Sequence, residues 1–398
     1  MKILHVYHIY PALFGGISRV MYDLTKELKK KKHKVTILTT DIILPKSSDE
    51  KIEAKTGITI IRAPIILKRI TKIFKQVIPF PSFYLAKMLT KNSDIIHFHG
   101  VGFFQMKVIS NYAKKYNVPY IFQAHGSLPP IIGKKKLKWL FYQFIGKKIL
   151  RDASKVIALS QIEVKQYIAL GVPKEKISII PNGINTRRIK KLSKSGSFKL
   201  KFGIHEDTKI ILYLGRIHRE KGLGFLLKSY AVMVKEMGVK NTILVIGGPN
   251  DGYQKDTLDL IHDLKISSFV LLVGWLTEKN KINAYVDSTV VVNVESKNVF
   301  GLVPLEAAAC STPVIVGSGN EISKTVKSGH FGFSVNYGNV SELSTKMKEL
   351  VENVNLAKIM GERGQKFVTK NFDWDHIITK FEKTYEEVVK GNLRPLFY

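Results

Sequence analysis

The 398-residue sequence contains one cysteine, Cys310, and only 32 acidic residues against 63 lysines and arginines. A single cysteine excludes an internal disulfide framework. The longest apolar runs are interrupted by polar residues or glycine well before the roughly 20 residues that a membrane-spanning helix requires. The N-terminal segment MKILHVYHIYPALFGG lacks the long apolar stretch and small-residue cleavage site of a secretory signal. These absences predict a cytosolic protein.

The excess of basic residues belongs mainly to the first half of the chain. Residues 1–190 contain 35 Lys and Arg and 10 Asp and Glu, a net charge of +25, and the remaining 28 bases and 22 acids contribute +6 to the total of +31. Such asymmetry predicts an anionic partner near the first half, either acidic lipid or nucleic acid. Use of lysine for solubility alone would give the same composition, so this alternative stays open.

The length favours two domains, because domains usually comprise about 100 to 200 residues. Short β-branched segments alternate with segments of helical periodicity in two series. The first series is KILHVYH, HKVTILTT, ITIIRAP, DIIHFHG, PYIFQAHG, KVIALS and ISIIPNG, and the second is KIILYLGRI, NTILVIGGP, FVLLVGW, TVVVNVE, PVIVGS and GFSVNYG. This alternation predicts an α/β fold of two doubly wound, Rossmann-like parallel-sheet domains.

We expect an N-terminal domain over residues 1–190 and a C-terminal domain over residues 191–373. The Lys-, Ser- and Gly-rich stretch KKLSKSGSFKLKFGI is interpreted as a linker between them. Residues 374–398 predict a terminal helix that packs back on the N-terminal domain. Its apolar face consists of Ile377, Ile378, Phe381 and Tyr385. A helix after the first strand has a similar face, made of Ile17, Val20, Met21, Leu24 and Leu28, with Lys29 to Lys32 in solvent.

Basic residues and a glycine stand together after the first strand of the second series. Arg216 follows that strand directly, and Lys221 and Gly222 precede a helix. Two cations beside a helix N-terminus suit a diphosphate, although a pair of solvated surface bases would look the same. Doubly wound sheets bind ligands at the carboxyl ends of their strands, so we expect this site in the cleft between the two domains.

Other strand ends give weaker signals. Gly15 and Gly16 stand before a helix, where they would let a phosphate approach the backbone, but a tight turn also explains such a pair. His125 ends another strand, and its neutral imidazole could hydrogen-bond a sugar hydroxyl or an acyl carbonyl. His97 and His99 occupy similar positions and are interpreted as structural histidines.

Glu306 is the only acid in the segment NVFGLVPLEAAACSTPVIVG. Pro304 predicts the first turn of a helix, with Glu306 in the same turn near the exposed amides. A carboxylate among Leu, Ala and Val requires partners, and ribose hydroxyls are suitable ones. An acid that only complements the helix dipole is the alternative.

Several of these segments together resemble a known family. The segments ISIIPNGI, GRIHREKG, NTILVIGGPNDGY, FVLLVGW and FGLVPLEAAACSTPVI are similar to the retaining glycosyltransferases of family 4, whose two Rossmann-like domains form the GT-B fold. The resemblance covers nearly the whole chain, and its motifs keep the family's order. It does not indicate which sugar is transferred.

The resemblance implies a role for each candidate residue. Arg216 and Lys221 would bind the diphosphate of a nucleotide sugar, Glu306 would hold the ribose, and His125 would contact the transferred sugar. Further contacts with the donor or acceptor are implied for Gly15, Gly16, Phe300, Gly301 and Leu302, and contacts with the base for the backbone near Gly274 and Trp275.

One position departs from the family's E-x7-E element. Its first acid falls at residue 298, which is Asn298 here. An amide keeps hydrogen-bonding capacity but loses the charge and gains donors, so we expect an altered preference for the donor sugar. Asn185 likewise stands where the family commonly has Asp, and we expect it to cap its loop.

The reaction implied by the resemblance is the transfer of a hexose from a UDP- or GDP-sugar with retention, by front-face attack and without a covalent intermediate. Arg216 and Lys221 would stabilise the leaving diphosphate, the role that a metal has in other enzymes. The leaving phosphate would act as the base for the acceptor hydroxyl. No metal or other cofactor is expected.

Two segments, residues 68–87 and 134–151, mix bases with aromatic and aliphatic residues. The second predicts an interfacial helix on anionic lipid, with a buried helix and a solvated rim as the alternative. We therefore expect a glycan or lipid-linked glycan acceptor, peripheral contact with the inner face of the plasma membrane, and a role in polysaccharide or glycolipid synthesis. A nucleotide-sugar epimerase, an inverting transferase and a nucleic-acid-binding protein are the alternatives, but no RNA-recognition element or recognition helix is evident.

Overall fold

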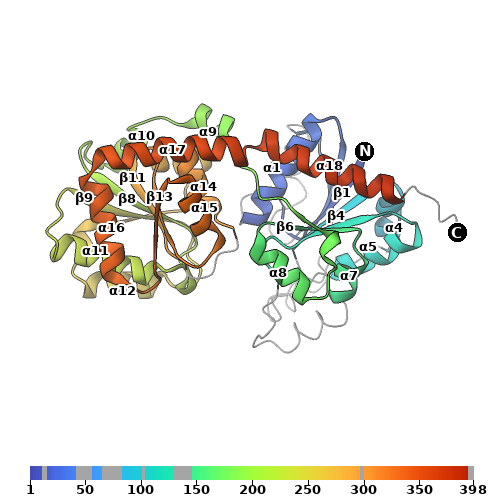
Figure 1. Ribbon diagram of the computed structural model, residues 1–398, viewed down its shortest axis with the longest axis horizontal. Coiled ribbons are helices and arrows are strands. Elements are labelled where there is room, and N and C mark those ends of the chain that lie inside the picture. The colour runs from blue at the N-terminus through green and yellow to red at the C-terminus, as the bar shows by residue number, and fades with distance from the viewer. Residues whose placement is uncertain are drawn as a thin grey trace. The chain divides into compact units, whose positions relative to one another are not determined.

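The computed structural model describes residues 1–10, 16–41, 56–64, 83–100, 104–128, 146–295 and 300–392. The chain forms two compact units, each a parallel sheet with helices packed against it (Figure 1). Unit 1 comprises Met1–Gly183 and Trp374–Tyr398, and unit 2 comprises Ile184–Asp373.

Unit 1 contains a seven-stranded sheet. Its strands are β1 (Lys2–Val6), β2 (Lys34–Thr40), β3 (Thr59–Ala63), β4 (Ile95–His99), β5 (Tyr120–Gln123), β6 (Lys155–Ala158) and β7 (Ile177–Ile179). They pair in parallel in the order β3-β2-β1-β4-β5-β6-β7. The chain extends the sheet in one direction from β1 and in the other from β4, so the topological switch point lies between these two strands.

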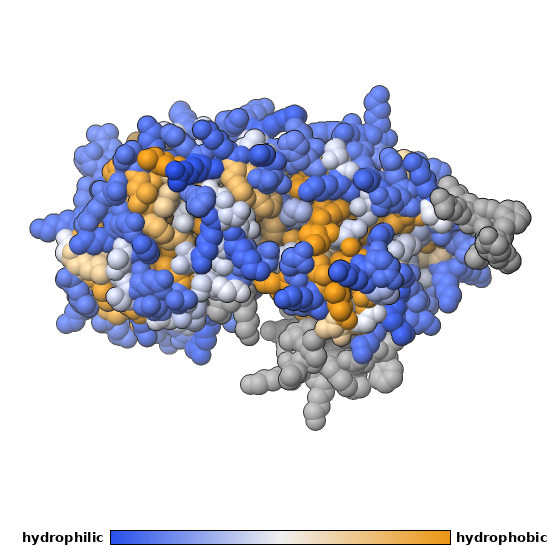
Figure 2. Space-filling view, viewed as in Figure 1, coloured by the Kyte–Doolittle hydropathy of each residue, from blue (hydrophilic) through white to orange (hydrophobic). Residues whose placement is uncertain are grey.

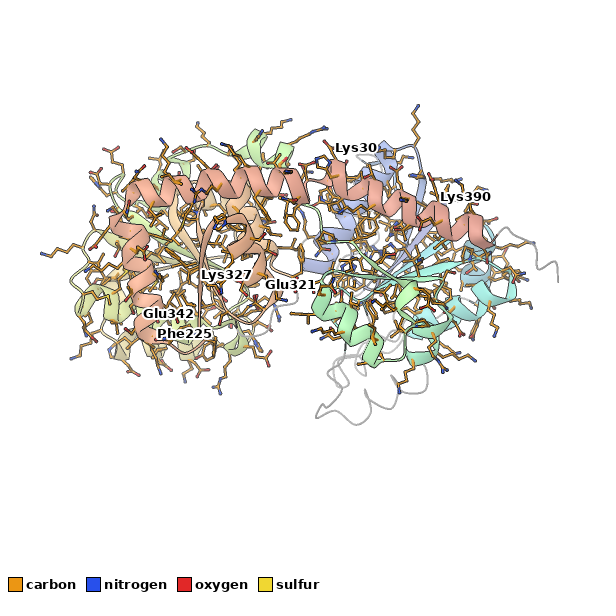
Figure 3. All side chains as sticks on the ribbon, viewed as in Figure 1. Lys30, Phe225, Glu321, Lys327, Glu342 and Lys390 are labelled. Carbon is orange, nitrogen blue, oxygen red and sulfur yellow. The ribbon has the colours of Figure 1, made fainter. Side chains whose placement is uncertain are left out.

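Helices cover the unit 1 sheet. They are α1 (Gly16–Lys30), α4 (Phe83–Lys91), α5 (Phe104–Lys115), α7 (Lys147–Asp152), α8 (Gln161–Ala169), the short 3-10 turn η3 (Lys174–Lys176) and α18 (Trp374–Asn392). The predicted face of α1 is confirmed except at Ile17, which is only partly buried. The buried residues of this face are Val20, Met21, Leu24 and Leu28. The exposed lysines that follow include Lys30, which is labelled at the end of this helix in Figure 3.

The C-terminal helix α18 belongs to unit 1, where it packs against α1. Its predicted apolar face is confirmed, since Ile377, Ile378, Phe381 and Tyr385 are all buried. Gly183 fixes the beginning of this helix. A Cβ atom at position 183 would lie only 2.4 Å from the Trp374 ring, so a larger residue there would displace the helix start.

Unit 2 contains a six-stranded sheet. Its strands are β8 (Lys209–Leu214), β9 (Thr242–Gly247), β10 (Val270–Gly274), β11 (Ser288–Asn293), β12 (Val314–Gly317) and β13 (Gly332–Val335). They pair in parallel in the order β10-β9-β8-β11-β12-β13, so the switch point lies between β8 and β11. The central strands β8 and β11 are almost entirely buried, as expected for a parallel sheet covered by helices on both faces.

The helices of unit 2 precede, connect and follow these strands. They are α9 (Thr186–Leu192), α10 (Ser197–Phe202), η4 (Arg219–Lys221), α11 (Leu223–Lys235), α12 (Gln254–Asp263), η5 (Ser267–Phe269), α13 (Glu278–Asp287), α14 (Leu302–Ala309), α15 (Glu321–Gly329), α16 (Val340–Glu352) and α17 (Val354–Phe372). Every strand predicted from the sequence is present, and the predicted fold of two Rossmann-like units is confirmed.

The prediction of a linker after residue 190 is wrong. This stretch contains the end of α9 and the whole of α10, and both helices belong to unit 2. The Asp287 carboxylate, from the end of α13, accepts hydrogen bonds from the backbone N–H groups of Gly196 and Phe198 at 2.6 and 2.8 Å. This cap comes from a distant part of the chain, so the local sequence does not reveal it. Asn185 does cap α9, as predicted, by accepting from the Arg188 N–H at 2.9 Å.

Hydrophilic side chains cover most of the face shown in Figure 2, with hydrophobic residues in separate patches between them. None of the helices that the structure describes combines the length and apolarity needed to cross a membrane.

Candidate active site

The basic residues predicted to bind a diphosphate lie at the switch point of unit 2. Arg216 and Lys221 follow β8, and the segment that leads to α14 follows the neighbouring strand β11. Gly222 has φ +74, and a Cβ atom there would lie 2.6 Å from the carbonyl oxygen of Val294. Only glycine therefore allows the turn that carries Lys221 to lie against the end of β11.

Each of these cations has a carboxylate partner. Arg216 forms an ion pair with Asp251, and both side chains are largely exposed, 57% and 43%. Lys221 forms an ion pair with Glu295, whose side chain is only 8% exposed. An exposed pair exchanges easily for another anion, whereas a buried one is more persistent. A diphosphate bound here would compete with both carboxylates.

The prediction that Glu306 lies in the first turn of α14 is wrong, because the residue lies in the second turn. The helix begins at Leu302, earlier than Pro304 suggested, and its first turn contains no acid. Two residues of α13 hold the carboxylate. Lys281 Nζ lies 2.7 and 2.8 Å from its two oxygens, and the Tyr285 hydroxyl donates to one of them at 2.9 Å.

The environment of Glu306 perturbs its neighbours. Burial, and secondly the Glu306 charge, raise the pKa of Tyr285 well above its usual value of 10.0, so its hydroxyl remains a donor. The same two causes raise the pKa of Cys310 to about 12, which makes this thiol unreactive.

The first turn of α14 contributes backbone amides to the same strand ends. Phe300, Gly301 and Leu302 lead directly into this helix, and the N-terminus of a helix favours an anion. Gly301 is tightly packed, since a Cβ atom there would lie 2.9 Å from Ile322.

Gly274 and Trp275 lie at the end of β10. Gly274 has φ +65, and its carbonyl accepts a hydrogen bond from the Gly248 N–H at 2.8 Å. The Trp275 side chain is 57% exposed, so its ring is available to a planar ligand.

In unit 1, His125 follows β5 with φ +54, in the left-handed region that few residues other than glycine adopt. Its Nε2 lies 2.9 Å from His99 Nδ1. Burial lowers the pKa of His125 to about 3. The next residue, Gly126, donates its N–H to the Glu163 carboxylate at 2.7 Å, and this bond holds the turn.

Some predicted residues lie outside the part of the chain that the structure describes. These are Gly15, Asn298, residues 68–82 and residues 134–145. Gly16 is the exposed first residue of α1. The last part of the predicted interfacial helix forms α7, in which Ile149 and Leu150 are buried.

The single Asp-x-Asp sequence, Asp373 to Asp375, is not part of the strand-end site. Asp373 pairs its backbone with Ile184, and its carboxylate accepts a hydrogen bond from the Thr186 hydroxyl. Asp375 lies in the first turn of α18. Through these contacts Asp373, the last residue of unit 2, is held against the first residues of that unit.

Sequence reasoning missed four residues of the site: Asp251, Lys281, Tyr285 and Glu295. Lys281 and Tyr285 are spaced by four along one helix, so a shared face was visible in the sequence, but nothing local indicated that α14 packs against it. Glu295 closes the segment TVVVNVE, and an acid directly after a buried strand is a signal that could have been used.

Two family models match the chain along most of its length. Residues 14–188 match Glycosyltransferase Family 4, and residues 196–367 match Glycosyl transferases group 1. The chain belongs to glycosyltransferase family 4. It is therefore a glycosyltransferase with the GT-B fold, as the resemblance implied. Arg216, Lys221 and Glu306 lie in the part that the second model covers, and His125 lies in the part that the first covers.

Relatives of known name are distant. N-acetyl-alpha-D-glucosaminyl L-malate synthase of Bacillus anthracis is 24% identical over 96% of either chain. Alpha-monoglucosyldiacylglycerol synthase of Acholeplasma laidlawii is 24% identical over 97% of either chain. Other curated relatives align over only 60% and 64% of their own length.

Solved structures share the fold. The crystal structure of Anabaena Alr3699/HepE in complex with UDP has a TM-score of 0.78 and 17% identity, over 97% of this chain and 100% of that one. At this identity the similarity establishes the fold, and the function has to be argued from the residues.

Proposed function

We propose that this glycosyltransferase moves a hexose, with retention, from a UDP- or GDP-sugar to a glycan or lipid-linked glycan at the cytoplasmic face of the membrane. The observation that carries the proposal is the position of Arg216, Lys221 and the α14 N-terminus at the carboxyl ends of β8 and β11. Two cations and a set of helix amides at a switch point suit the diphosphate of a nucleotide sugar.

In this proposal Arg216 and Lys221 exchange their carboxylate partners for the donor diphosphate. They stabilise the negative charge that grows on the leaving group as the glycosidic bond breaks. This is the role of a metal in other transferases, so no metal is needed at the diphosphate. The leaving phosphate accepts the proton of the acceptor hydroxyl on the face where that hydroxyl attacks.

Glu306 holds the ribose, with its carboxylate oriented by Lys281 and Tyr285. His125 contacts the transferred sugar, and Asn298 alters the preference for that sugar. The Trp275 ring and the backbone at Gly274 lie near the base. Support for a uridine nucleotide comes from the Anabaena structure, which is a complex with UDP.

The lipid-linked acceptor is supported by charge and by one relative. The first 190 residues carry a net charge of +25, which favours an anionic membrane surface. The Acholeplasma relative is named as a synthase of a glucosyl lipid. Flotation with vesicles of anionic or neutral phospholipid tests this part. Binding to both kinds or to neither would contradict it.

The donor site is tested by calorimetry with a panel of UDP- and GDP-sugars, on the wild type and on Lys221→Ala and Glu306→Ala. Lys228→Ala, an exposed lysine on α11, is the matched control. We expect one donor to bind to the wild type and to the control, and we expect this binding to be lost in both site variants. Absence of binding by every donor to the folded protein would refute the proposal.

Chemistry is tested with the donor so identified. NMR of the product reports the anomeric configuration, and assays with and without added Mg²⁺ or Mn²⁺ report any need for a metal at the diphosphate. Inversion, or a rate that depends on those ions, would contradict the mechanism. Isomerisation of the sugar without an acceptor would instead identify an epimerase. Asn298→Glu should change the donor profile.

A further inference from the structure

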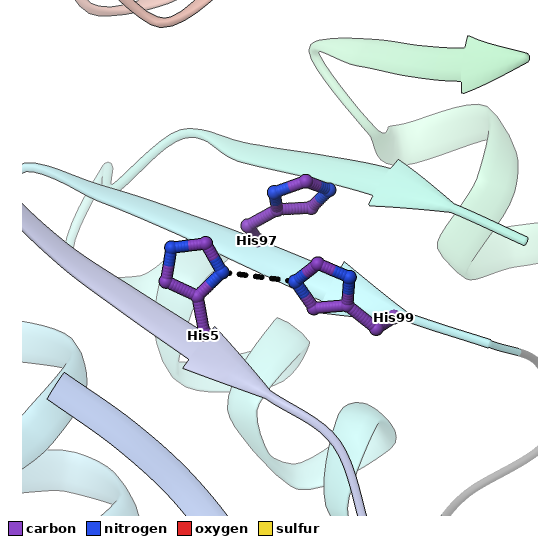
Figure 4. A group of neighbouring side chains, drawn as sticks. All are labelled: His5, His97 and His99. Carbon is purple, nitrogen blue, oxygen red and sulfur yellow. Dashed lines mark hydrogen bonds between the residues drawn. The ribbon is translucent and has the colours of Figure 1, made fainter. Parts of the chain in front are cut away.

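Three histidines lie together on one face of the unit 1 sheet (Figure 4). His97 and His99 alternate along β4, so their side chains point to the same side, and His5 on β1 is the register partner of His97. Each can present one ring nitrogen such that the three nitrogens lie within 4.8 Å of one another. All three side chains are fully buried.

The hydrogen bond within the cluster leaves two of its ring nitrogens without a partner in the described part of the chain. His5 Nδ1 lies 2.9 Å from His99 Nε2, the contact drawn as a dashed line in Figure 4. Among the residues that the structure describes, His5 Nε2 and His97 Nε2 are buried without a hydrogen-bond partner. Buried polar atoms of native proteins are nearly always paired, so the cluster requires another component.

The outward ring nitrogens have the partners that metal-binding histidines need. His97 Nδ1 lies 2.7 Å from the Tyr385 hydroxyl on α18, and His99 Nδ1 lies 2.9 Å from His125 Nε2. If each of these two histidines carries its proton on Nδ1, His97 donates to the Tyr385 hydroxyl and His99 donates to His125 Nε2. The Nε2 atom of each ring then carries no proton and has a lone pair for a metal. A second ring N–H donated in this way fixes the tautomer of a metal ligand.

We propose that His5, His97 and His99 bind one divalent transition metal, with Zn²⁺ as the best match. Zn²⁺ commonly takes three histidines and keeps a fourth position for solvent. A set of three nitrogens without a carboxylate disfavours Mg²⁺ and Ca²⁺, which prefer oxygen. The site connects β1 and β4 and, through Tyr385, α18. The proposed ligands are distinct from the residues proposed to bind the diphosphate, and His99 contacts His125.

The first test uses the full-length protein without a histidine tag. Elemental mass spectrometry should find about one transition-metal ion per chain after gel filtration. Protein stripped with a chelator should take up one equivalent of Zn²⁺ or Co²⁺ and unfold at a higher temperature. The Co²⁺ form should show the visible absorption of a tetrahedral site with nitrogen ligands.

Variants then locate the ion. His97→Gln should abolish the Co²⁺ spectrum, whereas His33→Gln should retain it. His33 is the matched control because it is also a buried histidine of unit 1 in contact with α18, through Glu382 at 2.9 Å. Tyr385→Phe keeps the three ligands and removes one outward partner, so the spectrum should persist with roughly 10- to 100-fold weaker affinity.

The proposal is overturned if the wild type neither carries a metal nor takes up Zn²⁺ or Co²⁺, and a buried water is then the partner of His97 Nε2. It is equally overturned if His97→Gln retains the spectrum, or if His33→Gln loses it. Should His97→Gln fail to fold, Tyr385→Phe decides: unchanged affinity contradicts the proposal, and weaker affinity with the same spectrum supports it.

Discussion

Glu306 presents both carboxylate oxygens to the ammonium group of Lys281, at 2.7 and 2.8 Å. This ion pair explains how an acid can lie in the otherwise apolar segment FGLVPLEAAAC. The ion pair and the Tyr285 hydroxyl bond compensate the loss of water around the carboxylate. They also fix the orientation of Glu306, which matters if this group holds a ribose.

Replacing Lys281 should therefore weaken donor binding without removing Glu306 itself. Lys281→Ala leaves a partly buried carboxylate without its cation, so we expect roughly 10-fold weaker binding of the donor and a loss of about 1–3 kcal/mol in unfolding free energy. Tyr285→Phe removes one neutral hydrogen bond and should cost about 1 kcal/mol. Calorimetry and urea denaturation measure the two effects. Donor binding unchanged in Lys281→Ala would show that Glu306 does not contact the nucleotide.

Glu295→Gln should tighten nucleotide binding. The Glu295 carboxylate neutralises Lys221 in the absence of a ligand, so removing its charge leaves the full charge of Lys221 for a diphosphate. We expect binding of UDP or GDP about fivefold tighter, or ~1 kcal/mol, together with lower stability of the unliganded protein. Calorimetry checks this. Weaker binding would instead mean that Glu295 holds Lys221 in its binding position.

Gly222→Ala should destabilise unit 2 more than an equivalent change elsewhere. Both Gly222 and Gly238 have positive φ, +74 and +68, so alanine at either costs about 1–2 kcal/mol of backbone strain. Only at position 222 does the new Cβ atom also meet a backbone atom, the Val294 carbonyl oxygen at 2.6 Å. Thermal unfolding of the two variants compares them directly. Equal losses would show that the turn after β8 moves away at little cost.

The strands were predictable because each is a short run rich in β-branched and other apolar residues between segments of helical periodicity, and this signal is contained in the local sequence. The start of α14 and the existence of helix α10 were not predictable in this way. The Asp287 side chain that caps α10 comes from α13, a contact that the local sequence does not contain. Local propensity does not report such tertiary caps.

In the candidate site, too, features with a local sequence signal were predictable and features that depend on tertiary packing were not. Arg216 and Lys221 could be selected from the sequence as candidates because both follow a strand and flank a glycine. Lys281 was missed because its contact with Glu306 depends on how α13 packs on α14. His97 and His99 were interpreted as structural histidines from their position on a strand, but their relation to His5 depends on the pairing of β1 with β4.

Glu163 should make the stability of unit 1 depend on pH between about 4.5 and 7. Burial raises the pKa of this carboxyl from 4.5 to about 7, although hydrogen bonds from the Leu159 and Gly126 N–H groups oppose the shift. Between these two values the folded protein binds a proton that the unfolded chain has lost. The unfolding free energy contributed by Glu163 is therefore complete below pH 4.5 and falls as the pH rises through 7, by on the order of 3 kcal/mol.

Urea denaturation across this pH range, compared between the wild type and Glu163→Gln, isolates the effect. The glutamine cannot titrate, so the difference in unfolding free energy between the two proteins should change with pH. The buried histidines contribute equally to both proteins and cancel in this difference. Glu175→Gln, at an exposed position, should retain the wild-type slope. A difference that does not vary with pH would mean that the two backbone N–H groups keep Glu163 ionised in the folded protein, where they would hold the His125 turn with a charged acceptor.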